Sequence, residues 1–178
     1  MKLFKALLLT VLTWSICAIQ AQAKDIFSAS SQGDTATVVQ LLQADSTLIN
    51  QQDHRGYTAL TLAAYNGHQH LVELLLQHGA DINAYDRSGN TALMGCAFRG
   101  YYEIASALIA NKASVNQQNF NGATALIFAS TFGHEDIVKL LIENGAQADL
   151  KDTHGMSALD HARMQGNSSI VALLEKNL

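Results

Sequence analysis

The sequence has 178 residues, of which 48% are hydrophobic and 15% charged, with no proline and a formal net charge of −4. This composition is typical of one globular domain and excludes disordered, collagen-like and disulfide-dense chains. The small number of basic residues argues against nucleic-acid binding, and a mean hydropathy near zero argues against several membrane spans.

The first 23 residues have the three regions of a secretory signal peptide. Lys2 and Lys5 form a basic start, an apolar run covers 6–19, and Gln20-Ala21-Gln22-Ala23 is a small-x-small ending. We expect cleavage after Ala23 and export by a bacterium, to the periplasm or the medium, with no membrane attachment afterwards. The alternatives are an uncleaved anchor and a lipoprotein at Cys17, although Ile16 stands where a lipoprotein signal needs a small residue.

A period of 33 residues runs through the rest of the sequence. A short motif, a later glycine and two aliphatic positions recur with this step. The series are Gly56-Tyr57-Thr58-Ala59-Leu60, Gly89-Asn90-Thr91-Ala92-Leu93, Gly122-Ala123-Thr124-Ala125-Leu126 and Gly155-Met156-Ser157-Ala158-Leu159; Gly67, Gly100, Gly133 and Gly166; Val72, Ala105, Val138 and Val171; and Leu75, Leu108, Leu141 and Leu174. Interleaved series with one period indicate a repeat protein whose units stack on their neighbours.

This pattern resembles the ankyrin repeat. The segment from Thr58 to His68, followed by 71–75 and by Gly79-Ala80-Asp81-Ile82-Asn83, is close to a consensus unit of that family. The resemblance covers nearly all of 24–178, and 25–42 looks like a divergent first unit. It implies an all-α solenoid of about five helix-turn-helix units with β-turn tips. The units are expected at about 24–52, 53–85, 86–118, 119–151 and 152–178.

Local signals predict the same helices without the family. Thr58, Thr91, Thr124 and Ser157 precede the first helices of four units as N-caps, and a glycine suited to the left-handed conformation closes each of these helices. Two features of the family are missing. Alanine replaces the proline that usually follows the N-cap residue, and the histidine that usually stands two residues later is absent. That puts the usual hydrogen bonding between repeats in doubt. Lys112 stands where Gly79 and Gly145 stand, which predicts a strained left-handed lysine.

The sequence lacks the motifs of catalytic and metal sites. It has no His-Glu-x-x-His, Cys-x-x-Cys or Gly-x-Ser-x-Gly. The nearest candidate metal ligands are His68 with His70 and His134 beside 135–136, but these positions fit ordinary helix starts. Cys96 stands in register with small inner-helix residues, which predicts a buried thiol. We therefore expect no catalytic residue, no metal and no cofactor.

The candidate binding residues stand at positions that the repeat does not fix. In ankyrin-like folds, the turn tips and the outward side of the first helix form a concave surface that binds other proteins. By that resemblance, the partner-binding candidates are Tyr57, Tyr65, Tyr85, Phe98, Arg99, Phe120 and Phe132. Aromatic side chains and arginine dominate interface hot spots. The alternative for two or three of the aromatics is packing as core between repeats.

These features predict a monomeric periplasmic or secreted protein that binds another protein and is not an enzyme. One hypothesis is a stabiliser or assembly partner of an exported enzyme such as a catalase, because exported bacterial ankyrin proteins include ones linked to peroxide defence. An alternative is an immunity or inhibitor protein that blocks a secreted toxin, and a third is a metal-dependent enzyme. Cleavage after Ala23 changes the net charge to 9 − 15 = −6, which favours a partner with a basic patch.

Overall fold

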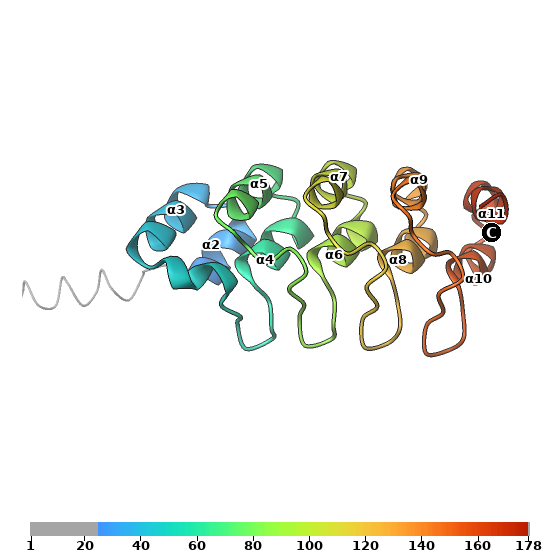
Figure 1. Cartoon of the computed structure of the whole chain (residues 1–178), viewed down its shortest axis with the longest axis horizontal. Helices are drawn as coiled ribbons and strands as arrows, with labels where there is room; N and C mark the ends of the chain where they lie inside the picture. Colours follow the sequence, from blue (N-terminus) through green and yellow to red (C-terminus); the bar gives the residue numbers. More distant parts are fainter. Residues whose placement is uncertain (1–24, 178) are drawn as a thin grey trace, which may run out of the picture.

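The computed structural model describes residues 25–177, and the predicted signal peptide, 1–23, lies outside this range. Helix pairs are stacked side by side in two layers (Figure 1). The first helices are α2 (Ile26–Gln32), α4 (Ala59–Tyr65), α6 (Ala92–Arg99), α8 (Ala125–Phe132) and α10 (Ala158–Met164). The second helices are α3 (Thr35–Ala44), α5 (Gln69–Gln77), α7 (Tyr102–Ala110), α9 (Glu135–Glu143) and α11 (Ser168–Glu175), with a 3-10 helix, η1 (Ser46–Asn50), after α3. The predicted all-α solenoid is confirmed for the described part of the chain.

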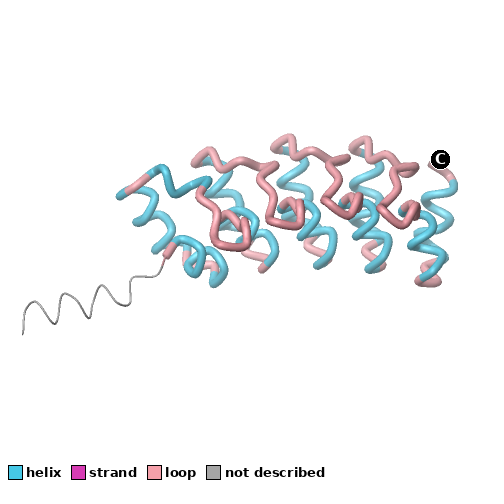
Figure 2. Tube along the Cα trace, turned by 90° about the horizontal axis from the view of Figure 1, so that it is seen from below, coloured by secondary structure: helices cyan, strands magenta, loops and turns pink. Residues whose placement is uncertain are grey.

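Long turns precede α4, α6, α8 and α10 and form a regular row along one side of the helices (Figure 2). We call these segments, 51–58, 84–91, 117–124 and 150–157, the finger turns. Each is linked to the next by a backbone hydrogen bond, for example from Thr153 N to Asn121 O at 2.9 Å. The stacking of repeats therefore fixes the turns as well as the helices.

The predicted N-caps are confirmed. Thr58 Oγ1 accepts a hydrogen bond from Thr61 N, and Thr91, Thr124 and Ser157 cap their helices in the same way. Thr61 and Asp160 bond back to the backbone of the capping residue, so that α4 and α10 begin with complete capping boxes. These two side chains satisfy helix-end N–H groups at positions where the family usually has histidine.

Three residues that directly follow a helix-closing glycine form side-chain hydrogen bonds to the preceding repeat. His68 Nε2 lies 2.9 Å from Ser31 O, His134 Nε2 lies 3.2 Å from Phe98 O, and Asn167 Nδ2 donates to Ser130 O at 3.2 Å. Because a carbonyl only accepts, each ring nitrogen must carry the proton. The doubt raised by the missing family histidine is therefore answered by other side chains.

Lys112 adopts the predicted left-handed conformation, with φ of 72°. Gly79 and Gly145 have φ of 82° and 84° at the same register. We expect Lys112→Gly to raise the free energy of unfolding by about 1 kcal/mol, because glycine reaches this region without a Cβ clash. Urea unfolding of both proteins measures the effect. A variant that is no more stable than the wild type would contradict the strain.

Cys96 is fully buried on α6, as predicted. Burial raises the pKa of its thiol to about 12, so that it stays protonated and unreactive at neutral pH. None of the described helices is both long and apolar enough to cross a membrane.

Candidate functional site

Four aromatic rings from three consecutive first helices form one cluster. Phe98 of α6 lies at its centre, with its ring centroid 6.1 Å from Tyr65 of α4, 4.5 Å from Phe132 of α8 and 6.4 Å from Phe128 of α8. Tyr65 stacks on Phe98 and the two phenylalanines meet it edge to face, which are favourable geometries for aromatic pairs. We call Tyr65, Phe98, Phe128 and Phe132 the aromatic cluster.

The outer rings of this cluster face solvent. Tyr65 is 44% exposed and Phe132 48% exposed, whereas Phe98 is half-buried by the three other rings. Arg99 lies beside the cluster, with its guanidinium carbon 5.4 Å from the centroid of the Tyr65 ring, and no carboxylate pairs with it among the described residues. The surface therefore offers apolar rings next to an unpaired cation.

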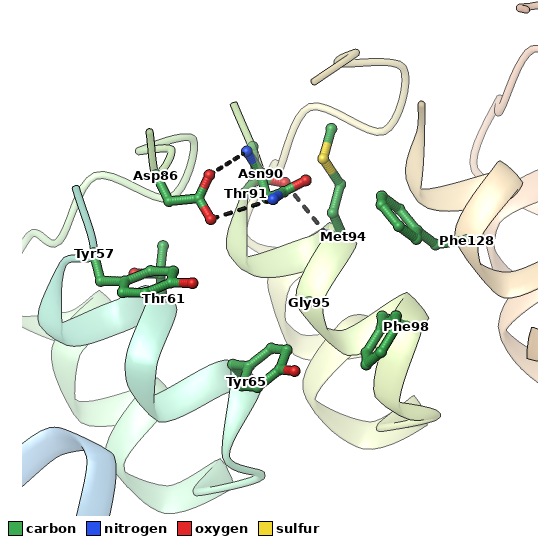
Figure 3. A pocket seen from close by; sticks show the side chains of 10 residues that line it. All are labelled: Tyr57, Thr61, Tyr65, Asp86, Asn90, Thr91, Met94, Gly95, Phe98 and Phe128. Carbon is green, nitrogen blue, oxygen red and sulfur yellow. Dashed lines mark hydrogen bonds between the residues drawn. The ribbon is translucent and has the colours of Figure 1, made fainter. Parts of the chain in front are cut away.

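A pocket of about 250 Å³ opens beside the cluster, between α4, α6 and the finger turns (Figure 3). Its aromatic walls are Tyr57, Tyr65, Phe98 and Phe128. Gly95 of α6 lines the pocket without a side chain, and a Cβ added there would make an ordinary contact with Tyr65 Cδ2, at 3.4 Å. The volume is suited to one large side chain.

The finger-turn side of the pocket is polar. Asp86 Oδ1 accepts hydrogen bonds from the backbone N–H groups of Ser88 and Asn90, which holds its turn in shape. Asp86 Oδ2 accepts from the Asn90 amide at 3.2 Å (Figure 3), and Asn119 Nδ2 in turn donates to Asn90 Oδ1 at 2.8 Å. A carboxylate therefore forms part of a largely aromatic pocket.

A family model described as ankyrin repeats (3 copies) matches residues 26–119 and 94–177. The chain belongs to the ankyrin repeat family. No curated protein matches the sequence significantly. Ankyrin repeats are generally protein–protein interaction modules and are typically not enzymes, which makes the pocket and the aromatic cluster the natural candidates for a binding site of this ankyrin domain.

The seven predicted site residues fall into two groups. Tyr65, Phe98 and Phe132 lie in the aromatic cluster, with Arg99 beside it, and Tyr57 lines the pocket. The other two, Tyr85 and Phe120, lie on the finger turns, where they are 48% and 65% exposed and pair edge to face at 5.9 Å. Within the described residues no ring contact joins this finger pair to the aromatic cluster. The candidates thus mark two separate surfaces.

Of the ten residues that line the pocket of this ankyrin domain, seven were not predicted from the sequence, and three of these define its shape and charge. Phe128 was overlooked because it follows the start of α8 among ordinary core residues, and Asp86 because it repeats a turn position. Gly95 carried the signal that could have revealed the pocket. It lies inside an inner helix, in register with the bulky residues Leu62, Phe128 and His161.

Two of the histidines considered as metal ligands, His68 and His134, have other roles. His68 and His134 bond to backbone carbonyls of the preceding ankyrin repeat. Across the part of the chain that the structure describes, no group of three or more His, Cys, Asp or Glu side chains is placed to hold a metal ion.

The acidic excess of the domain lies largely away from the pocket. All five glutamates lie on the second helices, at Glu73, Glu103, Glu135, Glu143 and Glu175. Asp86 is the only charged residue among those that line the pocket. A basic patch on the partner stays a prediction. At this pocket, attraction of a basic group would come from Asp86 rather than from the net charge of the domain.

In the last repeat, hydrogen bonds stabilise the charged form of the Asp152 carboxyl group. Burial by itself raises the pKa of Asp152, but hydrogen bonds from Met156 N, from His161 Nε2 at 2.8 Å and from His154 N outweigh it, so its pKa lies below the ordinary value. A lowered pKa means that the carboxylate stabilises the fold above about pH 4 and that this contribution is lost as the pH falls further.

We expect Asp152→Asn to lower the free energy of unfolding by about 1–2 kcal/mol at pH 6, because a charge-assisted hydrogen bond is lost. Asparagine keeps the turn, as Asn119 does in the preceding repeat. The difference from the wild type should shrink at pH 3, where the wild-type carboxyl is also being protonated. Urea unfolding at both pH values measures it, and equal differences would show that the charge of Asp152 does not contribute.

Proposed function

We propose that this ankyrin protein is exported to the periplasm and binds another protein there, through the aromatic cluster and the adjoining pocket. The observation that carries the proposal is the exposure of Tyr65 and Phe132 on either side of Phe98, in three consecutive repeats. Solvent-facing aromatic rings at repeat-to-repeat junctions add little to stacking that smaller side chains could not provide. They are well suited to fill or line pockets of a partner.

Export is supported by the signal-like pattern in 1–23 and by two features of the domain. Asp25 caps the first described helix, which starts at Ile26, so that cleavage after Ala23 would leave the cap in place. The one cysteine of the domain is buried with a raised pKa, which suits an oxidising compartment because it cannot readily form stray disulfides.

The role that we propose within the periplasm is that of a non-catalytic partner of an exported enzyme, such as a catalase. A partner of this kind would be stabilised or assembled by contact with the cluster. The protein itself would need neither cofactor nor metal, and a monomer would suffice because the binding surface lies within one chain.

Two measurements test the proposal. N-terminal sequencing of the protein from a periplasmic fraction should give Lys24 as the first residue, and a protein that starts at Met1 in the cytosol would contradict export. The immobilised domain should then retain a periplasmic enzyme, with Tyr65→Ala/Phe132→Ala as the matched control that retains less. A secreted toxin retained instead would replace the stabiliser role by that of an immunity protein, and equal retention by both proteins would exclude this surface.

A further inference from the structure

The pocket exists because one position of the repeat lacks a side chain. Leu62, Gly95, Phe128 and His161 occupy the same register in four consecutive repeats. In the second, fourth and fifth repeats this position carries a bulky side chain, and in the fifth that side chain, His161, bonds to Asp152 of its own finger turn. In the third repeat, Gly95 leaves the corresponding space open to solvent.

The carboxylate beside the pocket also differs from its counterparts. Asp53, Asp86, Asn119 and Asp152 each use one side-chain oxygen to fix their own finger turn. The second oxygen of Asp53 faces Arg55 at 3.7 Å and that of Asp152 faces His161 at 2.8 Å, while Asn119 is neutral. Asp86 Oδ2 receives only the amide of Asn90, and no cation pairs with it among the described residues.

The fifth repeat shows what fits such a space. His161, in the register of Gly95, places Nε2 2.8 Å from Asp152 Oδ2. Because the pKa of Asp152 is lowered, its carboxylate accepts, and the imidazole nitrogen must be the donor. A flat, nitrogen-bearing ring therefore fills in the fifth repeat the position that is vacant in the third.

We propose that the pocket receives an arginine side chain of the partner protein, with the guanidinium donating to Asp86 Oδ2. This assignment rests on the proposed function and names the chemistry of its partner. A guanidinium is planar, stacks on aromatic faces and pairs with carboxylates. A pocket of about 250 Å³ with four aromatic walls and one carboxylate matches each of these properties.

Among the described residues, the arginines of this chain that lie nearest the pocket do not pair with Asp86. Arg55 lies 4.8 Å from the centroid of the Tyr57 ring and Arg99 lies 5.4 Å from that of Tyr65. Two of the pocket's rings thus already hold guanidinium groups of this chain. Neither arginine lines the pocket, and neither does Arg87, which follows Asp86 on the same finger turn, so that the carboxylate of Asp86 is left for an incoming cation.

The direct test uses a probe that carries only the side chain. Titration of the domain with N-acetylarginine methylamide, followed by NMR, should give saturable shifts at Tyr57, Tyr65, Gly95 and Phe98. The citrulline analogue, which has the same shape without the charge, should give none. Equal shifts with both probes, or arginine-induced shifts confined to other residues, would overturn the assignment.

Two variants separate the carboxylate from the cavity. Asp86→Asn should keep the fold, as Asn119 does, and weaken arginine binding about tenfold or more, because a charge-assisted hydrogen bond is lost. Gly95→His should fill the pocket as His161 does and abolish probe binding in a folded protein. Unchanged binding in a folded form of either variant would overturn the proposal.

Binding of the captured partner to three variants distinguishes the arginine assignment from the more general proposal that the aromatic cluster binds a protein. If Tyr65→Ala/Phe132→Ala loses the partner while Asp86→Asn and Gly95→His bind it fully, the arginine assignment fails and protein binding by the cluster stands. If all three bind fully, both fail. Loss of affinity in all three, with thermal melts that show folded proteins, is the result that we expect.

Discussion

Replacing both Tyr65 and Phe132 by alanine should weaken partner binding by about 3 kcal/mol or more, which is over 100-fold in affinity. Both rings are about half exposed and flank Phe98, so they are available to a partner. The free energy of unfolding should fall by about 1–3 kcal/mol without loss of the fold, because each ring loses one aromatic contact and the burial of about half its surface. Calorimetric titration and thermal melts of the same samples measure the two effects.

Phe98 is left unchanged in this variant for a structural reason. It contacts all three other rings of the aromatic cluster and is half-buried, so its truncation would mix stability with binding. Tyr85→Ala/Phe120→Ala is the matched control, since it removes two rings that are at least as exposed, from the separate finger pair. Affinity lost in the control but not in the first variant would move the binding surface to the finger turns.

A second large effect is expected at the glycines of the finger turns. Gly122→Ala should lower the free energy of unfolding by about 3 kcal/mol or more, whereas Gly155→Ala should cost only about 1–2 kcal/mol. Both glycines have positive φ, of 73° and 76°. A Cβ at Gly122 would lie 2.9 Å from the backbone of Asp152 in the next repeat, but a Cβ at Gly155 meets nothing within 4 Å.

The difference between these two variants isolates the packing of one repeat on the next. Both variants introduce similar backbone strain, but only Gly122→Ala forces neighbouring finger turns apart. Urea unfolding of each variant gives the comparison. Equal losses of stability would show that contacts between finger turns do not contribute to the free energy of unfolding. The stacking of repeats would then depend on the helices alone.

Most of the fold could be predicted because it is set by local and periodic signals. The capping hydroxyls at Thr58 and Thr91, the glycines that close helices, and the left-handed Lys112 depend on short segments of chain. A period of 33 residues then places equivalent side chains next to one another in space. Tyr65 and Phe98 stand in the same register of successive repeats, so their stacking follows from that period.

The pocket could not be predicted in the same way, because it depends on what is missing between repeats. Its walls come from three repeats, and its space comes from the absence of a side chain at Gly95. The half-burial of Phe98 likewise depends on Phe128 and Phe132 of the following repeat. In the sequence Asp86 is one more turn residue, and what distinguishes it from Asp152 is that no histidine bonds to its second oxygen.

Hydrogen–deuterium exchange of the domain, with and without its captured partner, tests most directly which face of the solenoid binds. We expect slower exchange in the finger turns that flank the pocket and in α4, α6 and α8, around Tyr65, Gly95 and Phe128. Backbone amides of the second helices α5, α7 and α9 should exchange at the same rate in both states. Protection confined to those second helices would contradict binding through the first helices and the finger turns.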